Sequence, residues 1–195
     1  MYRILSMTAL CAQLTLDPLL LPEARQSFRE LISKDQIETA VQAIALQIDA
    51  DLQGEEVILL VVLKGAMVFA SDLSRCLQSP CRIECIRAKS YGMNGNRRSE
   101  LTISGLEEID LAGKNVLIVE DIFDSGVTLS TIMNEVQKMN PKKNRSVTLL
   151  IKNVKHLTDY RPDYSLFEIE DHFVIGYGLD YKEKWRHLPA IYISQ

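Results

Sequence analysis

The sequence has no excess of basic charge, no cysteine pattern of a metal site and no long apolar run. Its 22 basic residues are outnumbered by 26 acidic ones, and the formal net charge is -4. A nucleic-acid partner is therefore not expected, and any anionic ligand must be held by local groups. The four cysteines include no CxxC pair and no histidine at zinc-finger spacing, so we interpret them as reduced thiols of a cytoplasmic protein. They are Cys11, Cys76, Cys81 and Cys85.

The apolar stretch 4–21 is too interrupted to be a membrane span. Gln13 and Asp17 divide it, and Arg3 is the one basic residue before it. A transmembrane helix needs about 18 or more consecutive apolar residues. We therefore expect no membrane partner and interpret the stretch as packing on the domain, with secretion as the minor alternative.

The length and composition are typical of one globular domain. A chain of 195 residues with 47% hydrophobic and 25% charged residues can bury one substantial core. No internal repeat, low-complexity tract or linker divides it. We predict a single domain over residues 1–195, in which the packing of residues 1–34 is left open.

Hydrophobic periodicity predicts alternating strands and helices. Residues 35–52 show helical spacing after Ser33, a suitable N-cap, and a second long helix is predicted at 128–139, with a shorter one after Met67. The stretch 89–106 is rich in glycine, asparagine and charge, which predicts a long loop. The predicted strands are 57–63, 81–88, 116–119, 147–151, 163–169, 173–177 and 190–193, with a weak one at 101–103. This order predicts an α/β fold around a mostly parallel central sheet flanked by helices, with the terminal segments forming a cap.

The segment 119–129, VEDIFDSGVTL, is predicted to form a loop that binds a ribose phosphate. Ligands of open α/β sheets bind beyond the carboxyl ends of the strands, where Glu120 and Asp121 are expected. Adjacent carboxylates there can address ribose hydroxyls or the hydration shell of magnesium. The alternative interpretation is that both are solvated loop charges.

The second half of this segment has the composition of a phosphate loop. Ser125 and Thr128 supply hydroxyl groups, Gly126 allows close backbone approach, and the following helix supplies unpaired N–H groups. The alternative is that Asp124 or Ser125 merely caps that helix.

The residues VLIVEDIFDSGVTL (116–129) resemble the signature of the phosphoribosyltransferase family, in which an apolar run and two acids precede Asp-(Thr/Ser)-Gly-x-Thr. The resemblance implies the type I fold, with a small hood built from the terminal segments. It implies that Glu120 and Asp121 contact the ribose of phosphoribosyl pyrophosphate and lie near a metal, and that Asp124 assists proton transfer at the base. The implied phosphate loop is Asp124, Ser125, Gly126, Val127 and Thr128.

Further segments resemble the hypoxanthine-guanine branch of the family. Lys64 and Gly65, after Leu63, resemble its pyrophosphate loop, where a non-proline cis peptide is characteristic. Ser90 and Tyr91 resemble the start of a mobile catalytic loop that closes over the site and excludes water. The function of Arg97 and Arg98, which follow that motif, is not assigned.

Segment 173–180, FVIGYGLD, resembles the purine-binding strand of the same branch. The resemblance implies that Phe173 stacks on the base, that the Val174 backbone bonds its edge, and that Asp180 coordinates Mg²⁺. Arg186 would contact pyrophosphate. Lys152 matches the lysine that donates to the exocyclic oxygen of a 6-oxopurine, which favours hypoxanthine or guanine over adenine.

Together these motifs imply a Mg²⁺-dependent enzyme of purine salvage that makes IMP or GMP, as a homodimer or homotetramer. Two alternatives stay open: a non-catalytic regulator that senses nucleotides with the same fold, and an enzyme that prefers xanthine. His156, His172 and His187 have no metal-site spacing, so we interpret them as surface or packing residues.

Overall fold

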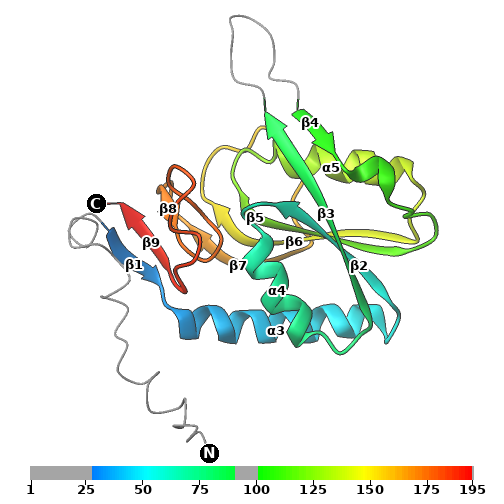
Figure 1. The fold of residues 1–195 in the computed structure, drawn as a ribbon, viewed down its shortest axis with the longest axis horizontal. Coiled ribbons are helices and arrows are strands. Elements are labelled where there is room, and N and C mark those ends of the chain that lie inside the picture. Colours follow the sequence, from blue (N-terminus) through cyan, green and yellow to red (C-terminus); the bar gives the residue numbers. More distant parts are fainter. Residues whose placement is uncertain (1–27, 91–100, 195) are drawn as a thin grey trace, which may run out of the picture.

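The computed structural model describes residues 28–90 and 101–194. Two sheets organise this part of the chain (Figure 1). The larger has six strands in the order β4-β3-β2-β5-β6-β7 and the smaller has three in the order β1-β9-β8. Within the larger sheet all pairings are parallel except that of the edge strand β4 with β3. The strands are β1 (Phe28–Ile32), β2 (Val57–Leu63), β3 (Cys81–Ser90), β4 (Leu101–Ser104), β5 (Asn115–Phe123), β6 (Lys143–Lys152), β7 (Tyr164–Ile169), β8 (Val174–Ile175) and β9 (Ile191–Ser194).

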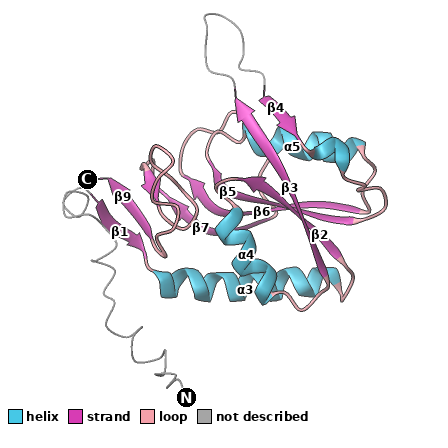
Figure 2. Cartoon of the chain, in the orientation of Figure 1, coloured by secondary structure: helices cyan, strands magenta, loops and turns pink. Residues whose placement is uncertain are grey.

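Helices cover both faces of the larger sheet (Figure 2). The helices are α3 (Lys34–Leu52), α4 (Met67–Cys76) and α5 (Val127–Lys138), with a short 3-10 turn at Leu106–Glu108. Alternate residues of β2 serve two cores: Leu59 and Val61 pack with α3 and α4, whereas Leu60 and Val62 pack with α5. This double burial explains why β2 is apolar throughout, as a central parallel strand should be.

Local sequence signals set the ends of α3. The Ser33 hydroxyl accepts a hydrogen bond from the Gln36 amide, and the Gln36 side chain accepts one from the Ser33 amide, which completes a capping box. At the other end Gln53 and Gly54 adopt left-handed conformations and turn the chain toward β2. The predicted helix and its cap are confirmed.

The smaller sheet is the hood. β9, near the C-terminus, lies between β1 and β8 and pairs antiparallel with both. The strand β1 was not predicted, because its sequence FRELI alternates too weakly to stand out. The predicted cap of terminal segments is confirmed. The N-terminal stretch 4–21 lies outside the described residues.

Several strand boundaries differ from those predicted, and the one that bears on the site is the end of β5. The strand β5 does not stop at Val119 but continues to Phe123, and it pairs with β6 along this length. The reason is that Phe123 is buried, so an extended backbone carries it into the core on the α5 side. Glu120 and Asp121 therefore lie within the strand, and the loop proper is only Asp124 to Gly126.

The strand order reverses between β2 and β5. From β2 the chain adds β3 and β4 on one side, and then returns to add β5, β6 and β7 on the other. Ligands of open α/β sheets bind where the strand order reverses in this way. The loops after β2 and β5 are neighbours at that point, and the hood lies at the carboxyl end of the sheet (Figure 1).

Candidate active site

Of the two acids near the end of β5, the first is buried and the second is half-buried. Glu120 is buried, and its Oε2 has no hydrogen-bond partner among the described residues. Burial raises the pKa of Glu120 well above its ordinary value, and the charge of Asp121 raises it further. Burial also raises the pKa of Asp121, although hydrogen bonds and the charge of Arg186 partly offset this. An unpartnered buried acceptor is suited to a hydroxyl group or a cation of a ligand.

Glu120→Gln should stabilise the protein when no ligand or metal is bound. Because the folded state raises the pKa of Glu120 above 4.5, it holds the proton more tightly than the unfolded chain does. The wild-type free energy of unfolding should therefore fall as pH rises above that value. In the variant this fall should be smaller, and at pH 8 its free energy of unfolding should be higher by about 1–3 kcal/mol. Urea unfolding between pH 5 and 8 with a chelator measures this, and identical pH slopes would contradict it.

The loop between β5 and α5 leaves the helix N-terminus open. Gly126 is the N-cap, with φ of 83°, and it makes no side-chain capping bond. Ser125 Oγ accepts only a long bond of 3.4 Å from the Val127 amide, and the Asp124 side chain is 56% exposed. Capping by Asp124 is therefore not observed. The N–H groups of the first turn remain positioned for an anion.

Residues after β6 form hydrogen bonds with the loop between β5 and α5. These contacts were not predicted from the sequence. His156 Nδ1 lies 2.6 Å from the Asp124 carbonyl oxygen, and its ring packs on Phe123 with centroids 4.8 Å apart. Since a carbonyl can only accept, Nδ1 carries the proton. The Leu157 amide donates to the Ser125 carbonyl at 2.8 Å. No local signal indicated these contacts, because 32 residues separate His156 from Asp124.

Lys152, the last residue of β6, faces the same loop. Its ammonium nitrogen lies 3.6 Å from an Asp124 carboxylate oxygen and 3.0 Å from one of Asp171. The Lys152 side chain is only 13% exposed. The structure therefore brings together Lys152 and Asp124 as the sequence suggested, and adds Asp171, which was not singled out. Asp171 accepts one hydrogen bond from the ammonium and Asp124 forms only an ion pair with it, so hydrogens of the ammonium remain for a ligand.

The loop after β2 contacts both the acids and the hood. A Cβ on Gly65 would lie 1.6 Å from Asp121 Oδ2, and a Cβ on Gly178 would lie 2.1 Å from the Gly65 carbonyl oxygen. Neither position can accommodate a larger residue without movement. The peptide bond between Leu63 and Lys64 is cis, so the non-proline cis bond implied by the resemblance precedes Lys64.

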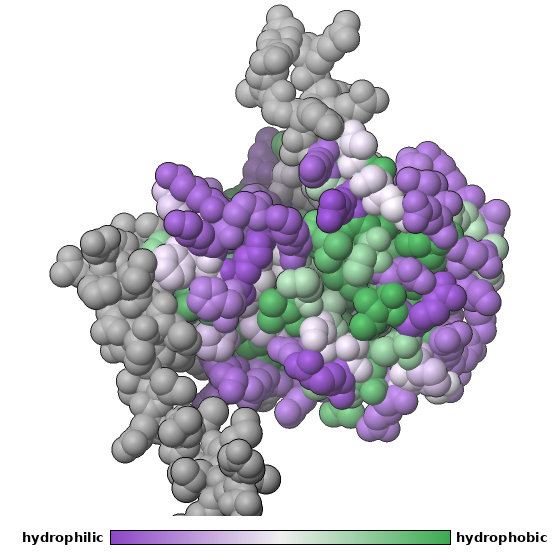
Figure 3. All heavy atoms as spheres, in the orientation of Figure 1, coloured by the Kyte–Doolittle hydropathy of each residue, from purple (hydrophilic) through white to green (hydrophobic). Residues whose placement is uncertain are grey.

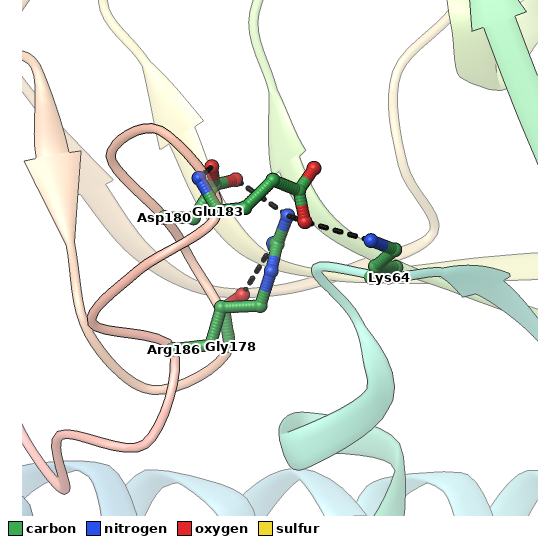
Figure 4. Close-up of polar contacts among 5 residues, drawn as sticks. All are labelled: Lys64, Gly178, Asp180, Glu183 and Arg186. Carbon is green, nitrogen blue, oxygen red and sulfur yellow. Dashed lines mark hydrogen bonds and ion pairs between the residues drawn. The ribbon is translucent and has the colours of Figure 1, made fainter.

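The hood loop supplies an arginine and two acids (Figure 4). Arg186 donates from Nη1 to the Gly178 carbonyl at 2.8 Å and forms an ion pair with Asp180 at 2.6 Å. The carboxylate of Glu183, a residue not singled out from the sequence, lies 2.7 Å from Lys64 Nζ and 3.5 Å from Arg186 Nη2. The Lys64 ammonium holds the pKa of Glu183 below its ordinary value.

The remaining candidate residues lie in the hood or at the edge of the described chain. Phe173 is 55% exposed and meets Tyr181 edge-on, with ring centroids 5.7 Å apart. Val174 is buried and pairs with Ile193 of β9. The backbone of Ser90 pairs with Leu101, whereas Tyr91, Arg97 and Arg98 lie outside the described residues.

The acids do not form a metal cage by themselves. Over residues 28–90 and 101–194, no group of three or more His, Cys, Asp or Glu side chains is arranged to hold a metal ion. Mg²⁺ commonly binds one or two carboxylates and completes its coordination with water and phosphate oxygens. The unpartnered Glu120 oxygen and the hood carboxylate of Asp180 fit that mode of binding, in which a ligand supplies the other oxygens.

Adjacent acids near a strand end, next to a helix N-terminus that has no side-chain cap, are suited to an anionic ribosyl ligand. The profile of the family described as phosphoribosyl transferase domain matches residues 30–182. The chain therefore belongs to the phosphoribosyltransferase family.

Within this family, the chain is similar to proteins named hypoxanthine-guanine phosphoribosyltransferase. It is 37% identical to that of Sus scrofa over 77% of this chain and 73% of the relative. It is 35% identical to that of Mycobacterium tuberculosis over 83% of both. The solved structure from Bacillus anthracis is 38% identical, covers 85% of this chain and 97% of its own, and has a TM-score of 0.78. A hypoxanthine phosphoribosyltransferase of Trypanosoma cruzi, a mutant solved as a ternary substrates complex, is 31% identical over 85% of this chain and 94% of its own, with a TM-score of 0.80.

Proposed function

We propose that the protein transfers the 5-phosphoribosyl group from phosphoribosyl pyrophosphate to hypoxanthine or guanine, which forms IMP or GMP and releases pyrophosphate. The observation that supports this most is that contacts join the loops after β2, β5 and β6 and the hood loop to one another. Each of the four brings a group suited to a different part of the two substrates. Family membership and the names of the relatives agree with it.

The ribose phosphate is assigned to β5 and the loop that follows it. The carboxylates of Glu120, which is buried, and of Asp121, which is half-buried, accept hydrogen bonds from ribose hydroxyls. The 5-phosphate binds at the open N-terminus of α5, to backbone N–H groups and the hydroxyls of Ser125 and Thr128. Gly126 and Val127 contribute backbone alone, so the variable side chain of Val127 matters little.

The purine is assigned to the gap between Lys152 and Phe173. Phe173 offers a half-exposed ring for stacking, and the Val174 backbone bonds the edge of the base. The Lys152 ammonium donates to the exocyclic oxygen of a 6-oxopurine. Adenine has an amino group there, which would leave two donors facing each other.

The chemical step needs proton acceptance, charge stabilisation and exclusion of water. Asp124 accepts the proton that leaves the purine ring nitrogen as that nitrogen bonds to the ribose and the bond to pyrophosphate breaks. Lys64, the Gly65 backbone and Arg186 stabilise the charge that grows on pyrophosphate, while Ser90 and Tyr91 belong to the loop that closes over the site. Mg²⁺, bound through Asp180, Glu120 and Asp121, would supply further charge neutralisation at the ribose and pyrophosphate oxygens.

A test of the base assignment uses Lys152→Ala. Purified protein, magnesium, phosphoribosyl pyrophosphate and each of hypoxanthine, guanine, xanthine and adenine are mixed, and nucleotide formation is measured. The variant should lose about tenfold or more in kcat/KM for hypoxanthine and guanine, the usual value of a charged hydrogen bond, with no loss for adenine. The exposed neighbour Lys155, changed to alanine, is the matched control.

The outcomes separate the rival functions. Wild-type turnover fastest with xanthine would change the assigned base. Tight nucleotide binding by calorimetry without turnover of any base would favour a regulator. Equal losses for all four bases in the Lys152 variant would refute its role in base choice.

We also propose a homodimer or homotetramer that acts in the cytoplasm. Figure 3 shows apolar side chains gathered in the middle of one face, where Figure 1 has β3, β2 and α4. Met67 of α4 and Ile83 of β3 are 53% and 50% exposed. An apolar surface of this kind is typical of contacts between subunits, and sedimentation tests the association. Among the described residues, no helix is long and apolar enough to cross a membrane.

A further inference from the structure

A carboxylate of the protein itself lies where the proposed substrate would place its pyrophosphate. Glu183 Oε2 is 2.7 Å from Lys64 Nζ and 3.5 Å from Arg186 Nη2. Figure 4 shows the Glu183 side chain reaching between these two cations, one from the loop after β2 and one from the hood. Both cations were assigned to pyrophosphate above.

A tight turn holds Glu183 in this place. Tyr181 and Lys184 exchange two backbone hydrogen bonds of 3.1 Å, and the two residues between them have φ of 52° for Lys182 and 64° for Glu183. Two successive positive φ values define a turn in which glycine or asparagine is preferred. The Glu183 amide also donates to Asp180 Oδ2 at 2.8 Å. The backbone is thus anchored in an unfavourable conformation that presents a carboxylate to Lys64.

We propose that Glu183 is a resident anion of the pyrophosphate site. Its carboxylate neutralises Lys64 and Arg186 in the ligand-free protein, and it must release them when the pyrophosphate group of the substrate binds. Glu183 thereby lowers the affinity for the substrate and for the pyrophosphate product. This inference rests on the proposed function, because that function assigns both cations to pyrophosphate.

The side chain is free to make this exchange. Glu183 is 65% exposed and Lys64 is 57% exposed, so their ion pair is screened by water and is weak. A pyrophosphate group has several charged oxygens and can displace a single carboxylate. Arg186 stays in position throughout, because Asp180 and the Gly178 carbonyl also hold it.

The test measures binding of inorganic pyrophosphate with magnesium by isothermal titration calorimetry. Glu183→Gln keeps the size of the side chain and the backbone of the turn but removes the charge. We expect it to bind pyrophosphate about threefold to tenfold more tightly than the wild type, as loss of two weak competing ion pairs predicts. The KM for phosphoribosyl pyrophosphate should fall by a similar factor.

The matched control is Glu56→Gln. Glu56 is exposed and directly precedes β2, so it lies at the opposite end of that strand from Lys64, about 26 Å away. The Glu56→Gln variant changes the net charge by the same amount as Glu183→Gln and should leave pyrophosphate binding unchanged. A Lys64→Met background should abolish most of the gain from Glu183→Gln if the competition is direct.

Pyrophosphate binding by these variants supports or overturns the role of Glu183. Unchanged or weaker pyrophosphate binding by Glu183→Gln would overturn the inference, as would a full gain in the Lys64→Met background. Failure of the proposed function looks different: the wild type itself would then neither bind pyrophosphate nor form IMP or GMP.

Discussion

Asp124→Asn should lower kcat for IMP formation about a hundredfold or more, with little change in the KM for phosphoribosyl pyrophosphate. A positioned general base contributes typically about 10²–10⁴-fold, and an amide cannot accept the proton of the purine ring. The loop should keep its shape, because it is His156 and the backbone carbonyl of Asp124 that form the 2.6 Å contact. Steady-state kinetics with each substrate varied in turn measures the two parameters.

Asp171→Asn is the control for this variant. Both aspartates form an ion pair with Lys152, at 3.6 Å for Asp124 and 3.0 Å for Asp171. If Asp124 acted only by fixing the ammonium, the two variants would lose similar activity. We expect Asp171→Asn to lose less than tenfold, and a loss equal to that of Asp124→Asn would refute the role in proton transfer.

The parts of the fold that were predicted from sequence are those with strong local signals. The apolar run of β2 and the capped periodicity of α3 each have one physical interpretation. The end of β5 was placed four residues early, because Glu120 and Asp121 are charged, and a strand that buries Glu120 contradicts ordinary patterning. Such a conflict between local pattern and observed structure is expected at functional sites.

The residues that were missed are those whose partners are distant in the chain. Glu183 pairs with Lys64, 119 positions away, and no short motif contains both. His156, in the loop after β6, meets Asp124 of the loop after β5, and Asp171, in the segment after β7, meets Lys152 at the end of β6; both contacts form only when these segments come together. Sequence patterns indicate what a residue can do within its own element, whereas the hood and the sheet order decide which residues it meets.

Gly65 has close contacts with two other parts of the site. Gly65 lies against Asp121 on one side and against Gly178 on the other. Asp121, which is assigned to the ribose, and the hood loop that carries Arg186, which is assigned to pyrophosphate, therefore both contact Gly65. A substitution at Gly178 is therefore expected to affect both the ribose site and the pyrophosphate site.

Gly178→Ala tests this linkage and should be severely damaging. The backbone of Gly178 has φ of +101°, and the new Cβ would lie 2.1 Å from the Gly65 carbonyl oxygen. The oxygen that the new Cβ meets belongs to the backbone and cannot rotate away, so the hood loop must shift. Arg186 must shift with it, because it bonds both the amide and the carbonyl of Gly178. We expect a loss of about 2–4 kcal/mol in the free energy of unfolding, and pyrophosphate affinity at least about tenfold weaker.

Gly54→Ala separates backbone strain from this clash. Gly54 has φ of +79°, but a Cβ there meets nothing within 4 Å, so its substitution should cost only the strain of about 1–2 kcal/mol. Gly54 lies in the turn before β2, at the opposite end of that strand from the loop that contacts the hood. The affinity of the Gly54→Ala variant for pyrophosphate should equal that of the wild type. Urea unfolding and calorimetry compare the two variants. If Gly178→Ala matched Gly54→Ala in both measurements, the contact between the hood and the loop after β2 would have no role in binding.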